Sequence, residues 1–269
     1  MTKLKEFVLF INHLLQNRQL IFRLIQNDFK KQYLGSYFGL FWAFAQPISY
    51  MLVIWLVFTY GLRSVSHGNM PYFLWLMSGM IPWFFIASAL QAGTNSIVSN
   101  SFLVKKVAFR VSILPLVQIS SALILHIGLL LFLIIIFFLY GYTPSIYWLQ
   151  LPYYIFFAFL VTLSISWLSA SFRVFIKDVS NFVTVMIQIG FWATPIFWNI
   201  EQVPEKYQWI LELNPAFYII KGYRDVFINH KWFWETPTLT LFFMIMTFST
   251  FIIGAIIFRK LRPHFGDVL

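Results

Sequence analysis

The chain has 269 residues, of which 60% are hydrophobic, only 10% are charged and none is cysteine. An average soluble domain is about 25% charged, so a chain this apolar requires lipid as its surroundings. The absence of cysteine excludes disulfides, thiolate catalysis and cysteine-based metal sites, and the five histidines show no ligand spacing. We therefore expect an all-α integral membrane protein without a metal site.

Six segments lack Asp, Glu, Lys and Arg and are long enough to cross, or nearly cross, the about 30 Å hydrocarbon core of a bilayer. The fifth segment is short for a span, and the third is long enough to include an interfacial turn. Residues 34–269 are thus predicted to form a six-span transmembrane domain with both termini on one side. The predicted spans are 38–60, 72–92, 111–140, 152–171, 182–198 and 238–258.

Charge predicts the orientation of these spans. The net charge of +10 falls entirely on the side that holds the two termini and the loops after spans two and four. Loops rich in Lys and Arg stay in the cytoplasm, so we expect a multi-pass protein of the cell membrane with cytoplasmic N- and C-termini. Because orientation accounts for the basic excess, nucleic acid is not an expected partner.

Residues 1–33 predict an amphipathic helix that lies in the plane of the cytoplasmic membrane surface. Ile21, Ile25 and Phe29 recur on one face, and basic side chains occupy the opposite face. Two interpretations remain open: the helix only attaches the chain to membrane lipid, or its basic face binds the anionic headgroup of a substrate. The candidate headgroup ligands are Arg23, Lys30 and Lys31.

The second cytoplasmic loop, residues 93–110, also has an amphipathic pattern. Asn95 or Ser96 is a candidate N-cap for a short helix, whose apolar face would project from the membrane into the groove of a partner. The alternative is an ordinary helical turn.

Between spans five and six, residues 204–213 and 215–228 show two helical patterns that meet at Asn214 and Pro215. Asn is a favoured N-cap and Pro a favoured first helical residue. Neither half is long enough to span, so we expect a re-entrant hairpin that dips into the outer leaflet; a surface hairpin is the alternative. Its far end carries Tyr223, Arg224 and Asp225. We expect the charged side chains of Arg224 and Asp225 to pair with partners at the membrane interface.

Several chemistries have no residues to support them. The chain contains no Gly-rich phosphate loop ending in Gly-Lys, so it has no ATP site of its own and no cofactor is expected in it. The predicted spans hold no Asp or Glu, which ion-coupled carriers use. His126 is their one titratable candidate, and we expect it to be packed or hydrogen-bonded rather than a proton relay. Two kinds of protein remain possible: a passive scaffold, or a pore that is driven by another polypeptide.

In the order of its motifs, the chain resembles the membrane subunit of ABC type-2 exporters of polysaccharides and polyol phosphates. The resemblance starts near residue 20 and includes the segment from Tyr33 to Trp42 (YLGSYFGLFW), Gln46-Pro47, Pro71-Tyr72, Ser78-Gly79, Pro82-Trp83, Lys177-Asp178, Thr194-Pro195, Asn214-Pro215 and Gly222 to Asp225 (GYRD). Within that family, residues 191–199 (FWATPIFWN), 204–207 (PEKY) and 232–235 (WFWE) are most similar to wall teichoic acid exporters.

The resemblance implies a homodimer of this chain with two ABC ATPase subunits, which bind Mg-ATP. The pore at the dimer interface would carry a polyprenyl-pyrophosphate-linked polymer outward for cell wall biogenesis, wall teichoic acid being the main expectation and O-antigen or capsular polysaccharide the alternative. Candidate pore residues, each of which can instead contact lipid or another helix, are Phe38, Trp42, Gln188, Phe191 and Trp192. Candidate residues for coupling to the ATPase are Ile97, Phe102, Lys105 and Lys106.

Three other function classes stay open from the sequence. A membrane enzyme acting on lipid-linked glycan intermediates would need a clustered acid, base or metal site, and the acids near the membrane edge, such as Asp178 and Asp225, are single. An ion-coupled carrier is opposed by the charge-free spans. A scaffold without transport would not change the activity of an associated ATPase.

Overall fold

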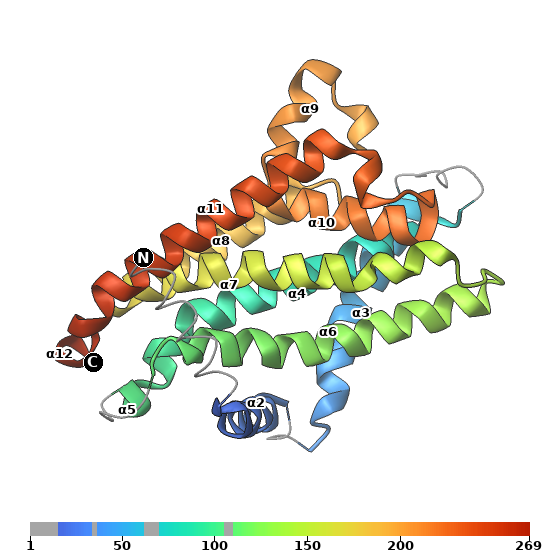
Figure 1. The fold of residues 1–269 in the computed structure, drawn as a ribbon. Coiled ribbons are helices and arrows are strands. Elements are labelled where there is room, and N and C mark those ends of the chain that lie inside the picture. The colour runs from blue at the N-terminus through green and yellow to red at the C-terminus, as the bar shows by residue number, and fades with distance from the viewer. Residues whose placement is uncertain (1–15, 34–36, 62–69, 105–109) are drawn as a thin grey trace.

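The computed structural model describes residues 16–33, 37–61, 70–104 and 110–269, and its elements in these ranges are helices and turns (Figure 1). Five of the described helical segments are long and apolar enough to cross a membrane. They are Leu40–Gly61, Tyr72–Ser99, Ile113–Leu139, Ile146–Phe175 and Pro237–Val268.

The first of these segments is helix α3 (Leu40–Leu56) continued by the π turn η1 (Val57–Gly61). The next two are α4 (Tyr72–Ser99) and α6 (Ile113–Leu139), with the short α5 (Ser101–Val104) between them. The fourth joins η2 (Ile146–Gln150) to α7 (Leu151–Phe175). The last joins α11 (Pro237–Leu261), η6 (Arg262–His264) and α12 (Phe265–Val268).

The fifth predicted span corresponds to α8 (Val179–Ala193), whose 15 residues make it shorter than the other five. At 1.5 Å per residue it is about 22 Å long, less than the about 30 Å hydrocarbon core. The predicted end at residue 198 was wrong, because the helix stops at Ala193. Thr194 is extended (φ −88°, ψ 138°), as the residue before a proline prefers to be, and it precedes Pro195. The six-span count stays a prediction.

Helix α4 lies at the centre of the bundle and packs against α3, α6, α7, α8 and α10 (Pro215–Arg224). Small side chains allow these helices to approach closely, as is common between helices in membranes. A Cβ at Gly93 of α4 would overlap the side chain of Ser166 on α7. A Cβ at Gly254 of α11 would lie 2.6 Å from the carbonyl oxygen of Ser164 on α7. The bundle therefore has a tightly packed centre formed by α4, α7 and their neighbours.

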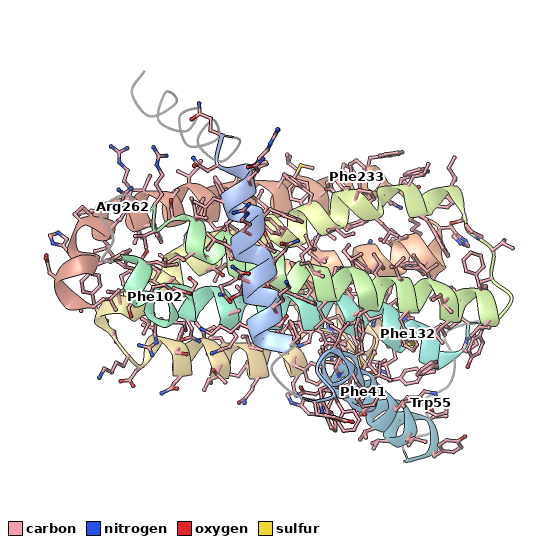
Figure 2. All side chains as sticks on the ribbon, turned by 90° about the horizontal axis from the view of Figure 1, so that it is seen from below. Phe41, Trp55, Phe102, Phe132, Phe233 and Arg262 are labelled. Carbon is pink, nitrogen blue, oxygen red and sulfur yellow. The ribbon has the colours of Figure 1, made fainter. Side chains whose placement is uncertain are left out.

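Helix α3 is bound more loosely: it contacts α4 and α6 but exposes most of its side chains. Helix α2 (Arg18–Tyr33), the described part of the predicted interfacial helix, crosses the long helices of the bundle (Figure 2). Ile21 of α2 packs on Ile113 and Val117 of α6. Asp28 of α2 also accepts a hydrogen bond from Gln118 of α6, so α2 is fixed to the bundle by apolar and polar contacts.

The two ends of the bundle differ. Figure 2 shows Phe102, in α5, and Arg262, after α11, at one end, whereas Trp55 and Phe233 lie toward the other. The loop after span two and the C-terminal segment are thus on the same side of the bundle, as the charge pattern predicts. Which of the two sides is cytoplasmic stays a prediction.

Candidate functional site: a polar and aromatic path beside α8

The segment between α8 and α11 forms two unequal halves. Helix α9 (Glu205–Glu212) projects from the bundle and buries no residue, whereas α10 buries eight residues among α4, α7 and α11 (Figure 1). Asn214 caps α10 by accepting a hydrogen bond from the Ala216 amide at 3.0 Å, and Pro215 is its first residue, which confirms both predictions. The dip of this hairpin into the outer leaflet stays a prediction.

Arg224, expected to meet a partner at the interface, is instead buried inside the bundle. Its guanidinium stacks over Trp75 of α4 at 3.5 Å and donates hydrogen bonds of 2.6 Å to the carbonyl oxygens of Pro195 and Ile196. These carbonyls follow the end of α8, where no helical N–H reaches them. Burial lowers the pKa of Arg224 to about 9, so the guanidinium keeps its charge at neutral pH.

A second contact fixes the same segment, because Tyr72 of α4 donates a hydrogen bond of 2.8 Å to the Phe197 carbonyl. Asp225 pairs with Lys221 at 2.7 Å and accepts from Asn229 at 2.8 Å, so this carboxylate is also used within the chain. Arg224 and Tyr72 therefore hold residues 195–197 between α4 and α10.

His126 and Tyr223 form a buried pair between α6 and α10. His126 Nε2 lies 2.7 Å from the Tyr223 hydroxyl, and Phe85 packs against the imidazole. This confirms the expectation that His126 is packed and hydrogen-bonded. Tyr223 of the predicted hairpin thus helps to fix α10 in the bundle.

A stripe of hydroxyl and amide side chains runs along α8 beside α4. Ser180, Thr184 and Gln188 are four residues apart, which places them on one face of the helix. Gln91 of α4 joins the stripe by donating to Ser180 Oγ at 3.2 Å and accepting from Thr184 Oγ1 at 3.1 Å. Thr184 and Gln188 are exposed. Polar groups on a lipid-facing surface are costly, so this face is suited to water or a polar ligand.

Aromatic side chains continue the stripe. Trp192 follows Gln188 by one turn, is 63% exposed, and borders with it a shallow hollow of about 620 Å³. Phe191 differs from its neighbour because it is buried against Trp83, Tyr50 and Phe197. Of this predicted pair, Trp192 is therefore exposed and Phe191 is used for packing.

Phe38 and Trp42 lie at the start of α3, where both are exposed and their rings meet edge to face at 6.3 Å. Neither belongs to the hollow beside Trp192. Trp42 instead borders a larger cleft of about 1140 Å³ between α3 and the pair α4 and α6, which also reaches the end of α2. The predicted pore residues thus lie on two separate surfaces of the single chain.

The basic residues predicted to bind a headgroup, Arg23, Lys30 and Lys31, are exposed on α2. The coupling loop differs more from prediction. Helix α4 continues to Ser99, and Asn95 donates to the Gln91 carbonyl inside it, so the predicted cap at Asn95 or Ser96 was wrong. The separate helix in this loop is α5, which begins only at Ser101. Ile97 is completely buried in α4 and cannot reach a partner directly.

Phe102 on α5 is 59% exposed and available for contact with a partner. Lys105 and Lys106 lie outside the described residues. Within residues 16–33, 37–61, 70–104 and 110–269, no group of three or more His, Asp or Glu side chains is arranged to hold a metal ion. The described site therefore consists of hydroxyl, amide and aromatic groups.

The profile of the ABC-2 type transporter family matches residues 19–228, well over half of the chain. The chain belongs to the ABC-2 type transporter family. It is thus a multi-pass membrane protein of a family of transport membrane subunits.

Named relatives of this ABC-2 chain are similar along most of their length. An O-antigen export system permease protein RfbA of Klebsiella pneumoniae is 29% identical over 244 residues, which cover 90% of this chain and 92% of that protein. A second RfbA from the same species is 28% identical with the same coverage. The RfbA of Myxococcus xanthus is 26% identical over 223 residues, covering 82% of this chain and 85% of that protein.

Sequence reasoning missed two parts of this ABC-2 fold. Gln91, which joins the stripe on α8, was assigned only to the end of span two. Its position within an otherwise apolar segment, between Ser88 and Asn95, is a signal of a polar helix face. The carbonyls that Arg224 binds had no signal in the sequence, because backbone acceptors carry no residue identity.

Proposed function

We propose that this ABC-2 chain is the permease subunit of an ATP-driven exporter that moves a lipid-linked, O-antigen-type polysaccharide from the cytoplasm to the outer surface. The observation that carries the proposal is the similarity to three O-antigen export permeases, two of which align over nine tenths of the chain. Two copies of this chain and two ABC ATPase subunits, which bind Mg-ATP, would form the working assembly.

The stripe on α8 suits such a polymer. Hydroxyl and amide side chains exchange hydrogen bonds with sugar hydroxyls, and each such bond contributes only about 1 kcal/mol net, which lets a chain slide rather than stay bound. Trp192 offers a flat apolar surface to the C–H face of a sugar ring. In this proposal Ser180, Thr184, Gln188 and Trp192 line the path. Trp42 of α3 and Phe38, which precedes α3, are contributed at the dimer interface.

In this proposal the ATPase subunits drive the movement of the membrane helices. Phe102 of α5 is an exposed aromatic side chain at the end of the bundle that also carries the C-terminal segment (Figure 2). In the proposed orientation this end is cytoplasmic, and α5 with Lys105 and Lys106 contacts the ATPase. Because α5 directly follows α4, which crosses the centre of the bundle, a push on α5 is transmitted to the packed helices.

Wall teichoic acid is a second candidate cargo, favoured by residues 191–199, 204–207 and 232–235, which resemble teichoic acid exporters. The two candidates make different demands. A polyol-phosphate polymer carries one negative charge per repeat, whereas the path proposed here is formed by neutral side chains. The neutral stripe therefore favours a polysaccharide.

The test is reconstitution of the chain with its ATPase subunits in vesicles that contain a lipid-linked polymer. We expect ATP-dependent transfer of a lipid-linked O-antigen polysaccharide, and slower transfer of a polyol-phosphate polymer on the same lipid. Faster transfer of the polyol phosphate would replace the main proposal with the second. ATP-independent behaviour, or transfer of neither polymer, would contradict both.

A further inference from the structure

The cleft between α3 and the pair α4 and α6 is separate from the stripe on α8, and Trp42 is the one residue that it shares with the polymer path proposed above. Its volume is about 1140 Å³, above the range of about 300–1,000 Å³ typical of small-molecule sites. Small side chains on three helices face it and give it its width: Ala43 and Pro47 on α3, Ala87 on α4 and Ala122 on α6. Most of its lining is apolar, so it suits a hydrocarbon ligand.

The length of the cleft corresponds to one leaflet of a membrane. Along α3 its lining extends from Trp42 to Val53. Eleven residue steps of an α-helix measure about 16 Å, and half of the hydrocarbon core is about 15 Å. A single lipid tail that starts at one membrane surface therefore fits along the cleft to its full depth.

One end of the cleft is polar and lies next to positive charge. Gln32 and Tyr33, the last residues of α2, line this end. Lys30 and Lys31 precede them in the last turn of α2 and are exposed. Burial, together with nearby Asp28, raises the pKa of Tyr33, so its hydroxyl remains a proton donor. The last turn of α2 thus carries ammonium, amide and hydroxyl donors, which are complementary to a phosphate.

The position of this polar end is fixed. Ile21 of α2 is packed on Ile113 and Val117, and Asp28 is hydrogen-bonded to Gln118, all three partners being on α6. The same helix contributes Ala122, Leu125 and Leu129 to the apolar wall. Helix α6 thus fixes the position of the cationic end relative to the apolar wall. A ligand with a charged head and an apolar tail requires this fixed arrangement.

We propose that this cleft binds the isoprenoid tail of a polyprenyl phosphate, with the phosphate held by Lys30, Lys31 and Gln32 at the end of α2. The inference rests on the proposed function, in which the exported polymer is linked to a lipid. The methyl-branched, unsaturated tail packs against the rings of Tyr50, Phe84 and Phe85, which line the cleft. The cleft then holds the lipid while the polymer occupies the separate path along α8.

The test measures binding of a photoreactive polyprenyl monophosphate to the purified complex of this chain and its ATPase subunits. Ala122→Phe places a ring in the cleft, and we expect binding to fall about tenfold, equivalent to about 1.4 kcal/mol. Leu131→Phe, at an exposed position of the same helix, is the matched control and should bind as the wild type does. Ala87→Leu fills the cleft from α4 and serves if Ala122→Phe does not fold.

Two further experiments distinguish a polyprenyl phosphate from ordinary membrane lipid as the ligand of the cleft. Phosphatidylglycerol at the same concentration should not displace the probe; equal displacement would show ordinary membrane lipid in the cleft and overturn the inference. Lys30→Gln with Lys31→Gln should weaken binding of the polyprenyl phosphate but not of the corresponding polyprenol. Unchanged binding in Ala122→Phe and Ala87→Leu would also overturn it.

Failure of this inference is distinct from failure of the proposed function. If the wild-type complex exports the polymer but cross-links of the probe lie outside α3, α4 and α6, the tail site is wrong and the function stands. If the probe binds in the cleft but the complex moves no polymer, the function is wrong.

Discussion

Helices α3 and α4 are equally apolar but differ in what surrounds them. The spans Leu40–Gly61 and Tyr72–Ser99 have the same mean hydropathy of 1.7, and each contains an internal proline. Yet in the most apolar 18-residue window of each span, 11% of the first is buried in the chain, compared with 72% of the second. Hydropathy therefore determines that both enter the membrane, and it does not determine which one forms the core.

The difference follows from the shape of the side chains. Helix α4 carries small residues on several faces, including Gly79, Ala89, Gly93 and Ser96, so that neighbouring helices approach it from all sides. Helix α3 presents bulky exposed side chains, such as Phe41, Trp42 and Val53. In the proposed assembly these exposed faces meet lipid, the polymer or the second copy of the chain.

The largest effect on stability is expected at Arg224, which holds the centre of the bundle to the end of α8. Arg224→Ala leaves the Pro195 and Ile196 carbonyls unpaired and removes the stack on Trp75. We expect a loss of about 3–4 kcal/mol in the free energy of unfolding, measured by denaturant titration in detergent. Lys260→Ala removes an exposed basic residue of α11 as a control, and equal effects of the two changes would contradict the role given to Arg224.

Two leucines allow the packing of α3 and α4 to be compared directly. Leu76 of α4 is completely buried, whereas Leu56 of α3 is 47% exposed. Leu76→Ala creates a cavity and should reduce the free energy of unfolding by about 3 kcal/mol. Leu56→Ala should change it by less than about 1 kcal/mol in the isolated chain. A comparable loss at Leu56 would mean that α3 is packed as firmly as α4.

Two glycines allow the closeness of helix packing around α4 and α3 to be compared in the same way. In Gly93→Ala the new methyl group meets Ser166 of α7, and we expect about 2 kcal/mol of destabilisation. Gly61→Ala, at the end of the α3 span, has nothing within 4 Å of the new Cβ and is the matched control. Thermal unfolding of the purified variants distinguishes them, and a tolerated Gly93→Leu would refute the close contact of α4 with α7.

The smallest effect on stability, with the clearest effect on transport, is expected at the stripe on α8. Gln188→Ala removes an exposed side chain, so the free energy of unfolding should change by no more than about 0.5 kcal/mol. Transport of the polysaccharide in vesicles should fall several-fold if Gln188 lines the path. Ile189→Ala, the exposed apolar neighbour, is the control for a general effect on α8. Transport that is unchanged in Gln188→Ala and reduced in Ile189→Ala would remove the stripe from the path.

The sequence by itself determined the class of protein, the positions of the five long helices and the break at Asn214 and Pro215. These features depend on local properties: apolar length for a span, and capping and ring geometry for the start of a helix. It also placed His126 in a hydrogen-bonded setting, because a lone polar ring among apolar residues needs a partner.

Only the tertiary structure decided which of these segments form the core. It placed α10 inside the bundle and α9 outside, extended α4 to Ser99 into the first part of the predicted loop, and buried Ile97, Phe191 and Arg224. Such outcomes depend on which small side chains of distant segments face one another and on where backbone carbonyls are left unpaired. Neither property can be read from the hydropathy of one segment, because each belongs to a pair of segments.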